Sequence, residues 1–398
     1  MRRACLVLSV AALWQSGVTP TFADTGLYAL VDTTRDNNLF RLSDSTNTRA
    51  AIGTDERSDT FTRGELGINS DLNVGRQHFN VTANANRTMF NRYSFLDNTG
   101  GAANALWDWT VGNQWQGNLG YQYNRSLASF ELQGAGQDRR TQVTEFANAF
   151  YRLHPSWRTH VAVDRTNTDY SLASAASLEF EGRSGEIGLQ YIAPSENNVG
   201  IRLRTTRGDL PNRQIVNGVA VDNSYDQTET GFTFEWRIAG HSRLYGGVDH
   251  TRREHEQFPA RDFSGTTGRL NFDWNETDRV TWRIAAWRRL TESDNDLTAT
   301  YTVSDGVLLS PTWAISNKVR LEATAMRIKR DFRGDPQVLL LVLTDRQDVA
   351  RSGRLGLSYL LAPKFGFNVG YAVEKRSSNV ALADYDDRII DAGVRVEF

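Results

Sequence analysis

The sequence predicts an all-β fold, a transmembrane antiparallel up-and-down β-barrel of about 18 strands. Three observations indicate it. Apolar and polar residues alternate with a period of two in many short segments, short and long connections alternate between those segments, and tryptophans and tyrosines gather near the short connections. A period of two is typical of strands with one apolar and one polar face. A soluble β-sandwich or propeller is the alternative.

The first 23 residues have the pattern of a cleaved secretory signal peptide. Arg2 and Arg3 precede an apolar run from Ala4 to Trp14, and Ala23 stands at the expected cleavage position. The apolar run is too short to span a bilayer, which takes roughly 20 residues. We therefore expect Sec export, cleavage before residue 24, and one barrel domain over residues 24–398 in the outer membrane of a Gram-negative bacterium.

Composition argues against several classes of site. The single cysteine, Cys5, lies inside the predicted signal peptide, so we expect no disulfide, thiolate nucleophile or cysteine-ligated metal in the mature chain. No cofactor and no nucleic-acid partner are expected either. Four of the 45 basic residues are lysines and the other 41 are arginines. The fixed charge and planar donors of arginine suit a hydrogen-bonded wall.

Six segments show the alternation most clearly. They span residues 79–86, 232–238, 270–274, 280–284, 355–361 and 367–373. Tight turns are predicted at residues 75–77, 154–156, 193–197, 240–242, 275–278, 315–317 and 362–364. Longer polar connections are predicted at residues 42–57, 132–139, 208–224, 253–261 and 330–349.

This arrangement predicts a barrel with short turns at one end and long loops at the other. Outer-membrane barrels place their short turns on the periplasmic side and have an even number of strands. Nine hairpins are predicted, which give about 18 strands, an even number. The longest apolar run, Val338–Leu343, falls in a predicted external loop. It is either a strand extension above the membrane or a plug segment, and the sequence leaves both open.

Aromatic residues near the short turns predict a girdle at the level of the lipid headgroups. Its members are Trp115, Trp157, Trp236, Trp274, Trp282, Trp313, Tyr191 and Tyr359. The outer-membrane lipids are thus an expected partner.

The last segment, Asp384–Phe398, predicts the closing strand. From Ile390 onward every second residue is apolar, and the apolar positions end at Phe398. We expect this strand to pair with the one that starts near Gly26, which removes both sheet edges from lipid. Phe398 is the predicted assembly signal, read by the barrel-assembly machinery.

If the apolar positions face lipid, the opposite positions line the interior. The predicted lumen-lining residues are charged and of both signs: Arg202, Arg204, Glu235, Arg237, Arg269, Asp273, Arg283, Arg320, Glu322 and Arg395. They form either a network of ion pairs that holds the wall rigid or a ladder that selects solutes. An inward aromatic, Trp287, is a candidate stacking surface. A barrel of about 18 strands is wide enough for an aqueous channel unless loops fill it.

The sequence contains no motif that indicates catalysis. His250, His255 and Asp262 lie close together near a predicted external rim, but so short a mixed-charge segment is typical of solvated surface. A helical zinc motif does not fit a segment predicted as strand and loop. No catalytic, cofactor-binding or metal-binding residue is predicted, and we do not expect an enzyme.

Four stretches carry a resemblance to a known family. They are Thr34–Asp44 (TRDNNLFRLSD), Arg92–Asp97 (RYSFLD), Tyr151–Arg158 (YRLHPSWR) and Arg261–Gly265 (RDFSG). In their order and spacing they resemble the outer-membrane barrels encoded with exopolysaccharide biosynthesis systems, the EpsL type within the β-barrel porin group. The resemblance extends from about residue 26 to residue 398. It implies a role in making or exporting an extracellular polysaccharide.

The expected function is therefore a pore that supports exopolysaccharide export across the outer membrane. Its expected partners are the exopolysaccharide chain and periplasmic components of polysaccharide export. Three alternatives stay open: a general porin for small solutes, a rim enzyme that uses His250, His255 and Asp262, and a barrel that anchors polymer or partner proteins without transport.

Overall fold

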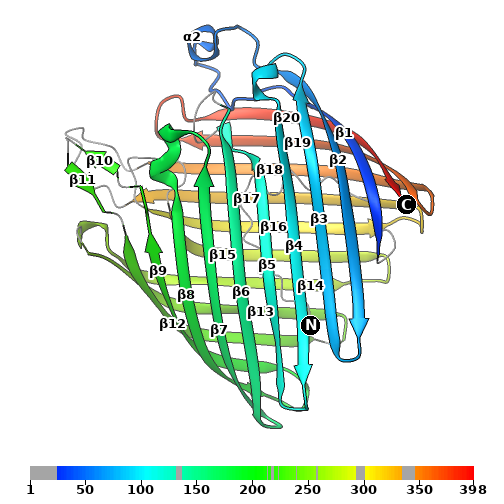
Figure 1. The fold of residues 1–398 in the computed structure, drawn as a ribbon, viewed down its shortest axis with the longest axis vertical. Coiled ribbons are helices and arrows are strands. Elements are labelled where there is room, and N and C mark those ends of the chain that lie inside the picture. The colour runs from blue at the N-terminus through cyan, green and yellow to red at the C-terminus, as the bar shows by residue number, and fades with distance from the viewer. Residues whose placement is uncertain are drawn as a thin grey trace.

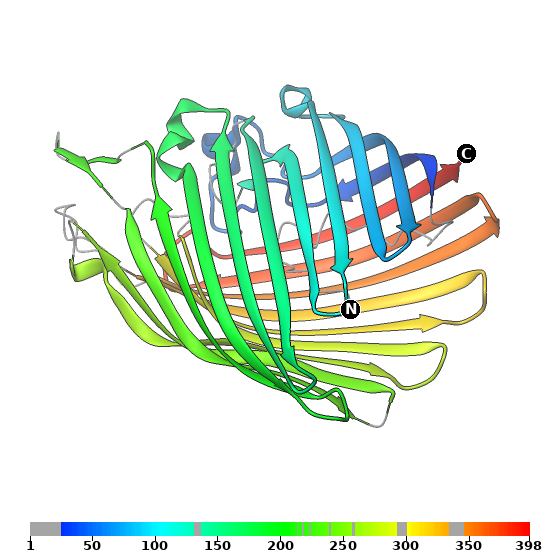
Figure 2. The ribbon, with the colours of Figure 1, turned by 60° about the horizontal axis from the view of Figure 1, so that its bottom comes forward.

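The computed structural model describes residues 25–130, 137–212, 214–216, 219–222, 224–238, 240–256, 259–292, 301–333 and 346–398. These residues form a closed antiparallel barrel of 18 strands, which confirms the predicted fold class. Figures 1 and 2 show the strands wrapped around a common interior. The predicted signal peptide and the Val338–Leu343 run lie outside the described residues.

The barrel strands are β1 (Gly26–Asp36), β2 (Asp59–Val74), β3 (Gln77–Phe90), β4 (Asn98–Val111), β5 (Trp115–Leu127), β6 (Arg139–His154), β7 (Trp157–Tyr170), β8 (Phe180–Ile192), β9 (Asn198–Asp209), β12 (Tyr225–Ile238), β13 (Ser242–His255), β14 (Phe263–Asn275), β15 (Val280–Glu292), β16 (Tyr301–Ala314), β17 (Val319–Arg333), β18 (Gln347–Ala362), β19 (Phe365–Ser378) and β20 (Tyr385–Glu397).

The connections contain the remaining elements. A short helix, α2 (Thr48–Ile52), lies between β1 and β2, and a small hairpin of β10 (Gln214–Val216) and β11 (Val219–Val221) lies between β9 and β12 (Figure 1). Among the described residues the connections also contain three 3-10 helices: η1 (Ser94–Leu96), η2 (Ala173–Leu178) and η3 (Pro259–Arg261). Among the described residues, no helix combines the length and apolarity needed to cross a membrane.

The first and last strands close the barrel. β1 pairs with β20 from Tyr28↔Glu397 to Asp36↔Ile389, and with β2 on its other side. The amide of Phe398 continues the pairing by donating to the carbonyl of Leu27 at 2.9 Å. Closure pairs the backbone groups that an open sheet edge would expose to lipid.

Short turns lie at one end of the barrel and the longer connections at the other. The seven predicted tight turns each fall between consecutive strands, and a further one at Gly112, with φ of +58°, joins β4 to β5. Three predicted loops begin too early: β9 extends to Asp209, β13 to His255 and β17 to Arg333, beyond the predicted starts at residues 208, 253 and 330. These strands continue above the apolar band because cross-strand pairing, such as Tyr225↔His255, continues there.

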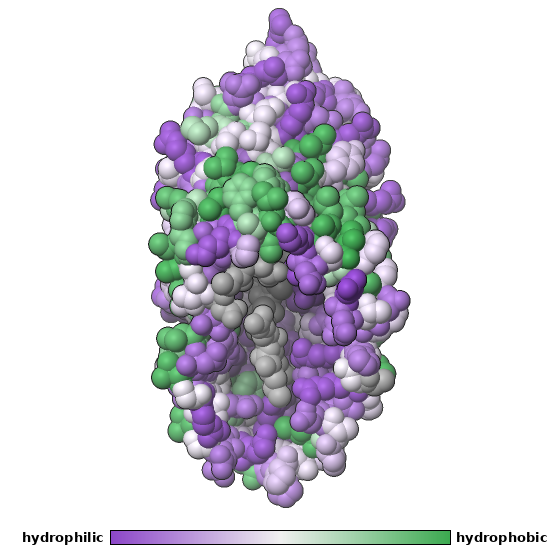
Figure 3. Space-filling model, turned by 90° about the vertical axis from the view of Figure 1, so that its right-hand side faces the viewer, coloured by the Kyte–Doolittle hydropathy of each residue, from purple (hydrophilic) through white to green (hydrophobic). Residues whose placement is uncertain are grey.

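The outer face of the barrel is apolar and exposed. On β9, Val199, Ile201 and Leu203 are exposed, while the residues between them point the other way. Figure 3 shows hydrophobic residues gathered in a broad patch, with hydrophilic residues above and below it. Trp115 packs against Tyr151, and Trp157 against Tyr191, beside the short turns. An exposed apolar surface of this kind suits lipid.

Several interior aromatic rings lie flat over glycines of neighbouring strands. A Cβ atom at Gly120 would lie 2.1 Å from the ring of Phe146, and one at Gly306 would lie 2.1 Å from the indole of Trp287. Tyr28 covers Gly67 in the same way. Because glycine has no side chain, each ring can lie along the wall and does not project across the interior.

The longer connections are packed and hydrogen-bonded. Leu39, Phe40, Phe90, Tyr93 and Leu96 form a small apolar core at the rim, and burial raises the pKa of the Tyr93 hydroxyl. This packing gives the loops after β1 and β3 a defined position above the wall.

One arginine in the first long loop holds the two ends of the barrel sheet together. Arg41, with φ of +57°, places its guanidinium 2.8 Å from Asp36 of β1 and 3.0 Å from Asp387 of β20. Burial by itself would lower the pKa of Arg41, but Asp36 and then Asp387 hold that pKa above its ordinary value. Asn38 adds a hydrogen bond to the carbonyl of Asp386 at 2.9 Å.

Candidate functional site

The inner face of the barrel has two parts that differ in chemistry. We call the inner face of β3–β6 the amide wall, and the inner face of the other barrel strands the charged wall. Because side chains alternate along each strand, the residues between the exposed apolar positions all belong to the inner face. The predicted lumen-lining residues all lie on the charged wall.

A dense ion-pair network occupies the charged wall at mid-height. Arg202 of β9 lies 2.6 Å from Asp249 of β13 and 3.1 Å from Glu186 of β8. Its neighbour on the same strand, Arg204, lies 2.6 Å from Asp164 of β7. These contacts join strands on both sides of β9. The network therefore cross-links the wall, as ion pairs do when several charges share partners.

The same network includes a histidine and an aromatic ring. His160 Nδ1 lies 3.3 Å from Glu186, and the imidazole stacks on Phe150 with ring centroids 4.5 Å apart. Arg204 also approaches Glu229 at 3.7 Å. Two arginines thus face four carboxylates, and the guanidinium groups of both arginines are engaged in the network.

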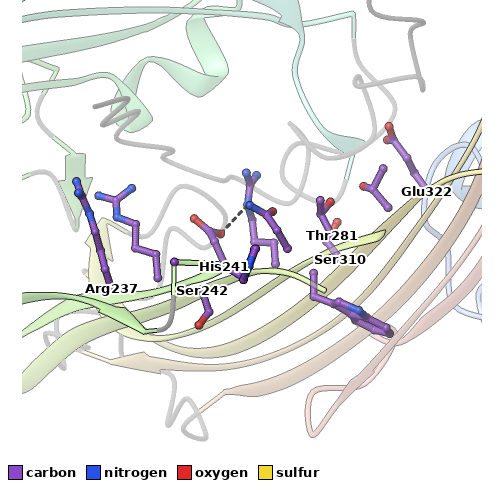
Figure 4. Close-up of a pocket in the computed structure, with 13 residues that line it drawn as sticks. Arg237, His241, Ser242, Thr281, Ser310 and Glu322 are labelled. Atoms are coloured by element: carbon purple, nitrogen blue, oxygen red, sulfur yellow. Dashed lines mark hydrogen bonds and ion pairs between the residues drawn. The ribbon is translucent and has the colours of Figure 1, made fainter. Parts of the chain in front are cut away.

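A cavity of about 700 Å³ opens near the short turns of β12–β17. It is lined by charged, polar and aromatic groups: Arg237, Gly240, His241, Ser242, Arg243, Asp273, Asn275, Thr281, Trp282, Arg283, Ser310, Thr312 and Glu322. Figure 4 shows Arg237, His241 and Ser242 on one side, Glu322 on the other, and Thr281 and Ser310 between them. The cavity is large enough for a small hydrated solute.

The arginines of the cavity are less engaged than those of the mid-height network. Arg283 Nε lies 3.4 Å from Asp273, and the Arg283 side chain is 61% exposed. Arg243 Nε lies 2.8 Å from Glu235, which is buried. Arg237 contacts Glu196 and remains partly exposed. Three guanidinium groups and two carboxylates line the cavity, so positively charged side chains outnumber negatively charged ones among its lining residues.

The structure places the predicted lumen-lining residues in distinct groups. Four of them line the cavity: Arg237, Asp273, Arg283 and Glu322. Arg202 and Arg204 belong to the mid-height network. The others contact neighbours on the charged wall: Glu235 contacts Arg243, Arg269 donates to Asn271 at 2.9 Å, Arg320 lies 4.0 Å from Glu322, and Arg395 lies 3.1 Å from Glu397 and covers the ring of Tyr28.

Sequence reasoning missed several partners of these residues. Arg243 stands on the inner face directly after a predicted turn, and Asp164, Glu186 and Asp249 stand on inner positions of their strands. The same alternation of apolar and polar residues that predicted Arg202 and Arg204 to face inward also places these four residues on the inner face. Trp287, expected as an inward stacking surface, lies on the inner face and packs against an apolar cluster of Ala285, Leu308, Met326 and Ile328.

The three residues considered for an enzyme do not come together. The buried imidazole of His255 has its Nδ1 atom 3.5 Å from Asp262, whose carboxylate also accepts from the His255 amide at 2.8 Å. His250 lies on the opposite face of β13 and approaches Ser264 at 3.5 Å. Within the described residues, no three histidine, cysteine or acidic side chains gather as a metal site would require.

Phe398 lies at the short-turn end, beside the start of β1. Its amide joins the β1–β20 pairing, and its side chain is 68% exposed on the outer face. A role in assembly remains a prediction.

Comparison with solved structures returns outer-membrane porins. A BenF-like porin from Pseudomonas fluorescens Pf-5 is 10% identical, with a TM-score of 0.47 over 95% of this chain and 100% of that chain. OccK2 (OpdF) from Pseudomonas aeruginosa is 10% identical, with a TM-score of 0.48 over 95% and 99%. OccK3 (OpdO) from the same species is 12% identical, with a TM-score of 0.46 over 97% and 99%.

At these scores the likeness to solved structures adds nothing to the barrel architecture already described. No curated protein matches the chain. A family model does match part of it, over residues 227–398, which is less than half of the chain. Those residues contain most of β12, the strands from β13 to β20 and all of the cavity lining. This C-terminal part of the barrel matches the model described as "Putative beta-barrel porin 2".

Proposed function

We propose that the protein is an outer-membrane pore through which small hydrophilic solutes diffuse. The observation that carries this proposal is a closed 18-stranded barrel with an apolar exposed exterior and a polar interior. An apolar outer band suits a bilayer, and a barrel of this size has room for an aqueous path. The match of residues 227–398 to a porin family model supports the same function.

The interior chemistry is consistent with passage and not with tight binding. A pore must hold its solutes weakly at several places, because a solute that binds tightly blocks the path. The cavity offers exposed guanidinium groups of Arg237 and Arg283 beside carboxylates of Asp273 and Glu322. Mixed charges of this kind solvate polar solutes in transit.

The experiment uses the purified protein refolded into lipid. In planar bilayers we expect steady single-channel conductance in potassium chloride, and in liposomes we expect swelling with small sugars and amino acids. A correctly folded barrel that neither conducts nor lets solutes of about 200 Da enter liposomes would contradict a diffusion pore. Heat-modifiable migration on a gel shows that the barrel is folded in each sample.

A narrower function, support of exopolysaccharide export, is proposed as the second candidate. Its support is the resemblance of the four stretches beginning at Thr34, Arg92, Tyr151 and Arg261. Local structure explains part of them: Arg41 joins β1 to β20, the Tyr93 amide donates to Asp59 at 3.0 Å, and Arg261 is buried. Deletion of the gene is expected to reduce polymer at the cell surface. Unchanged polymer yield would leave only the diffusion pore.

Assembly in the outer membrane is tested by deletion of Phe398. The exposed ring at the end of β20 is the proposed signal for the assembly machinery, so the shortened chain is expected to accumulate in the periplasm at several times the normal level. The measurement compares heat-modifiable barrel in outer-membrane fractions. Replacement of Phe398 by Tyr is the control and is expected to assemble. Normal assembly of the shortened chain would contradict this role.

A further inference from the structure

The middle of the amide wall is an uncharged strip that crosses four neighbouring strands. Between Asn80 and Thr88 on β3, Asn98 and Leu106 on β4, Gln116 and Ser126 on β5, and Gln142 and Phe150 on β6, every inner position is neutral. The amides of this strip include Asn84, Asn104, Asn118, Gln122, Gln142 and Asn148. The four strands are consecutive neighbours in the barrel, so these groups form one continuous surface.

Some of these amides are already used by the fold. Asn148 Nδ2 donates to Asn118 Oδ1 at 2.6 Å, Asn84 Oδ1 accepts from the amide of Ala102 at 3.2 Å, and Gln142 accepts from Arg140 at 3.0 Å. Each contact leaves part of the hydrogen-bonding capacity of its amide unused, because a side-chain amide has two donor hydrogens and two acceptor lone pairs.

Two other amides are free. Asn104 of β4 and Gln122 of β5 lie directly opposite each other. Within the described part of the chain neither side chain makes a hydrogen bond, and both are partly exposed. Next to them along β5, Gly120 accommodates the ring of Phe146 from β6, which lies flat against the wall. An open pair of amides therefore adjoins an aromatic ring.

This combination fits one class of solute. Hydroxyl groups are both donors and acceptors, and side-chain amides match them in both roles without a charge. Aromatic faces provide apolar area for the C–H surface of a sugar ring. An ion gains little from such a surface, since no opposite charge there offsets the loss of its hydration. The arginine cavity of β12–β17 is the contrasting surface, suited to charged groups.

From this geometry we infer that the amide wall, around Asn104, Gln122 and Phe146, is a weak binding track for uncharged polyhydroxylated solutes, namely neutral sugars and short linear neutral oligosaccharides. The inference rests on the proposed pore function and names its substrate class. Binding by two amides and one ring is weak, as passage requires.

The test measures block of single-channel current by maltohexaose, a neutral linear oligosaccharide. In the wild-type pore we expect concentration-dependent block. In the Asn104→Ala/Gln122→Ala variant we expect weaker block: the association constant of maltohexaose for the pore falls about three- to tenfold, as loss of one or two hydrogen bonds predicts. The matched control is Asn113→Ala, which removes an exposed amide from the turn of the same hairpin, outside the barrel wall. Maltohexaose is expected to block this variant as strongly as it blocks the wild-type pore.

Two further measurements keep the result specific. Gln122→Met preserves side-chain length and removes only the amide, so it substitutes for the double variant if that one does not assemble, and it is expected to weaken block about twofold or more. A poly(ethylene glycol) of similar size lacks hydroxyl groups along its chain, and its effect on current is expected to be the same in the variants and wild type.

The possible outcomes separate the two proposals. A pore that conducts but shows no block by maltohexaose, or equal block in the Asn104/Gln122 variants and wild type, would overturn the amide track and leave the diffusion pore standing. A folded protein with no conductance at all would overturn both. Weaker block in the variants with unchanged conductance would support the track.

Discussion

The charged wall and the amide wall use their polar groups in opposite ways. On the charged wall, Arg202 and Arg204 connect carboxylates from four other strands, and the side chains are bound to one another. On the amide wall, Asn104 and Gln122 face the interior without such bonds among the described residues. Charges taken out of water need partners, whereas a partly exposed amide does not. The charged wall thus stabilises the barrel, and the amide wall keeps groups available for solutes.

The largest effect is expected from breaking the charged network. Arg202→Ala removes the guanidinium group that pairs with Asp249 and Glu186. Both carboxylates have little exposure to solvent, so each loses a charged partner that water does not replace. We expect the free energy of unfolding to fall by about 3 kcal/mol, the lower end for a broken buried pair. Urea titration of the barrel in lipid vesicles measures this change.

The control for Arg202→Ala is an exposed ion pair on the outer face of β8. Arg183→Ala removes a pair with Glu181 in which the arginine side chain is 63% exposed. We expect the free energy of unfolding of this variant to fall by less than about 1 kcal/mol, because solvent screens exposed charges. Equal effects of Arg202→Ala and Arg183→Ala would contradict the assignment of stability to the mid-height network.

A smaller effect, on selectivity and not on stability, is expected in the cavity. Arg283→Gln removes an exposed positive charge that has one long contact to Asp273. We expect the ratio of anion to cation permeability to fall by up to about fivefold, which corresponds to the ~1 kcal/mol interaction of unit charges at about 4 Å in water. Reversal potentials in a salt gradient measure the ratio.

Arg288→Gln is the matched control for the cavity. Arg288 of β15 pairs with Asp305 of β16 at 3.1 Å on the outer face of the barrel, and neither residue lines the cavity. Its replacement is expected to leave the reversal potential unchanged. A similar shift in both variants would show that total charge, and not the cavity, sets the selectivity.

A smaller loss of stability than that of Arg202→Ala is expected on the amide wall. Asn118→Ala removes the hydrogen bond with Asn148 and leaves no buried charge. We expect a loss of about 1 kcal/mol in the free energy of unfolding, typical of one neutral hydrogen bond. The same urea titration applies, and a loss as large as that of Arg202→Ala would remove the distinction between the two walls.

Much of the fold was predictable because its signals are local. The tight turns at Gly75 and His154–Ser156, the exposed aromatics at Trp115 and Trp157, and the closing strand all follow from short windows of sequence. The errors fall at the rim, where β13 continues to His255. Polar residues there look like a loop, but pairing with β12 keeps the strand extended.

The site was less predictable than the fold. Alternation placed Arg202, Arg237, Arg283 and Glu322 on one face of their strands, but it assigned no partners to them. The sequence does not single out the amide wall, because Asn80, Thr82, Asn84 and Asn86 are simply the polar half of an alternating strand. Their meaning appears only when β3–β6 stand side by side and the same neutral composition recurs on each.

The sequence by itself determined which residues face lipid and which face the interior, because the side-chain direction of a strand depends only on position along it. Tertiary structure decided which inner residues meet. Arg202 and Asp249 are 47 residues apart and lie within 2.6 Å because β12 stands between β9 and β13 in a fixed register. Register and barrel closure are properties of the whole sheet, and no local pattern contains them.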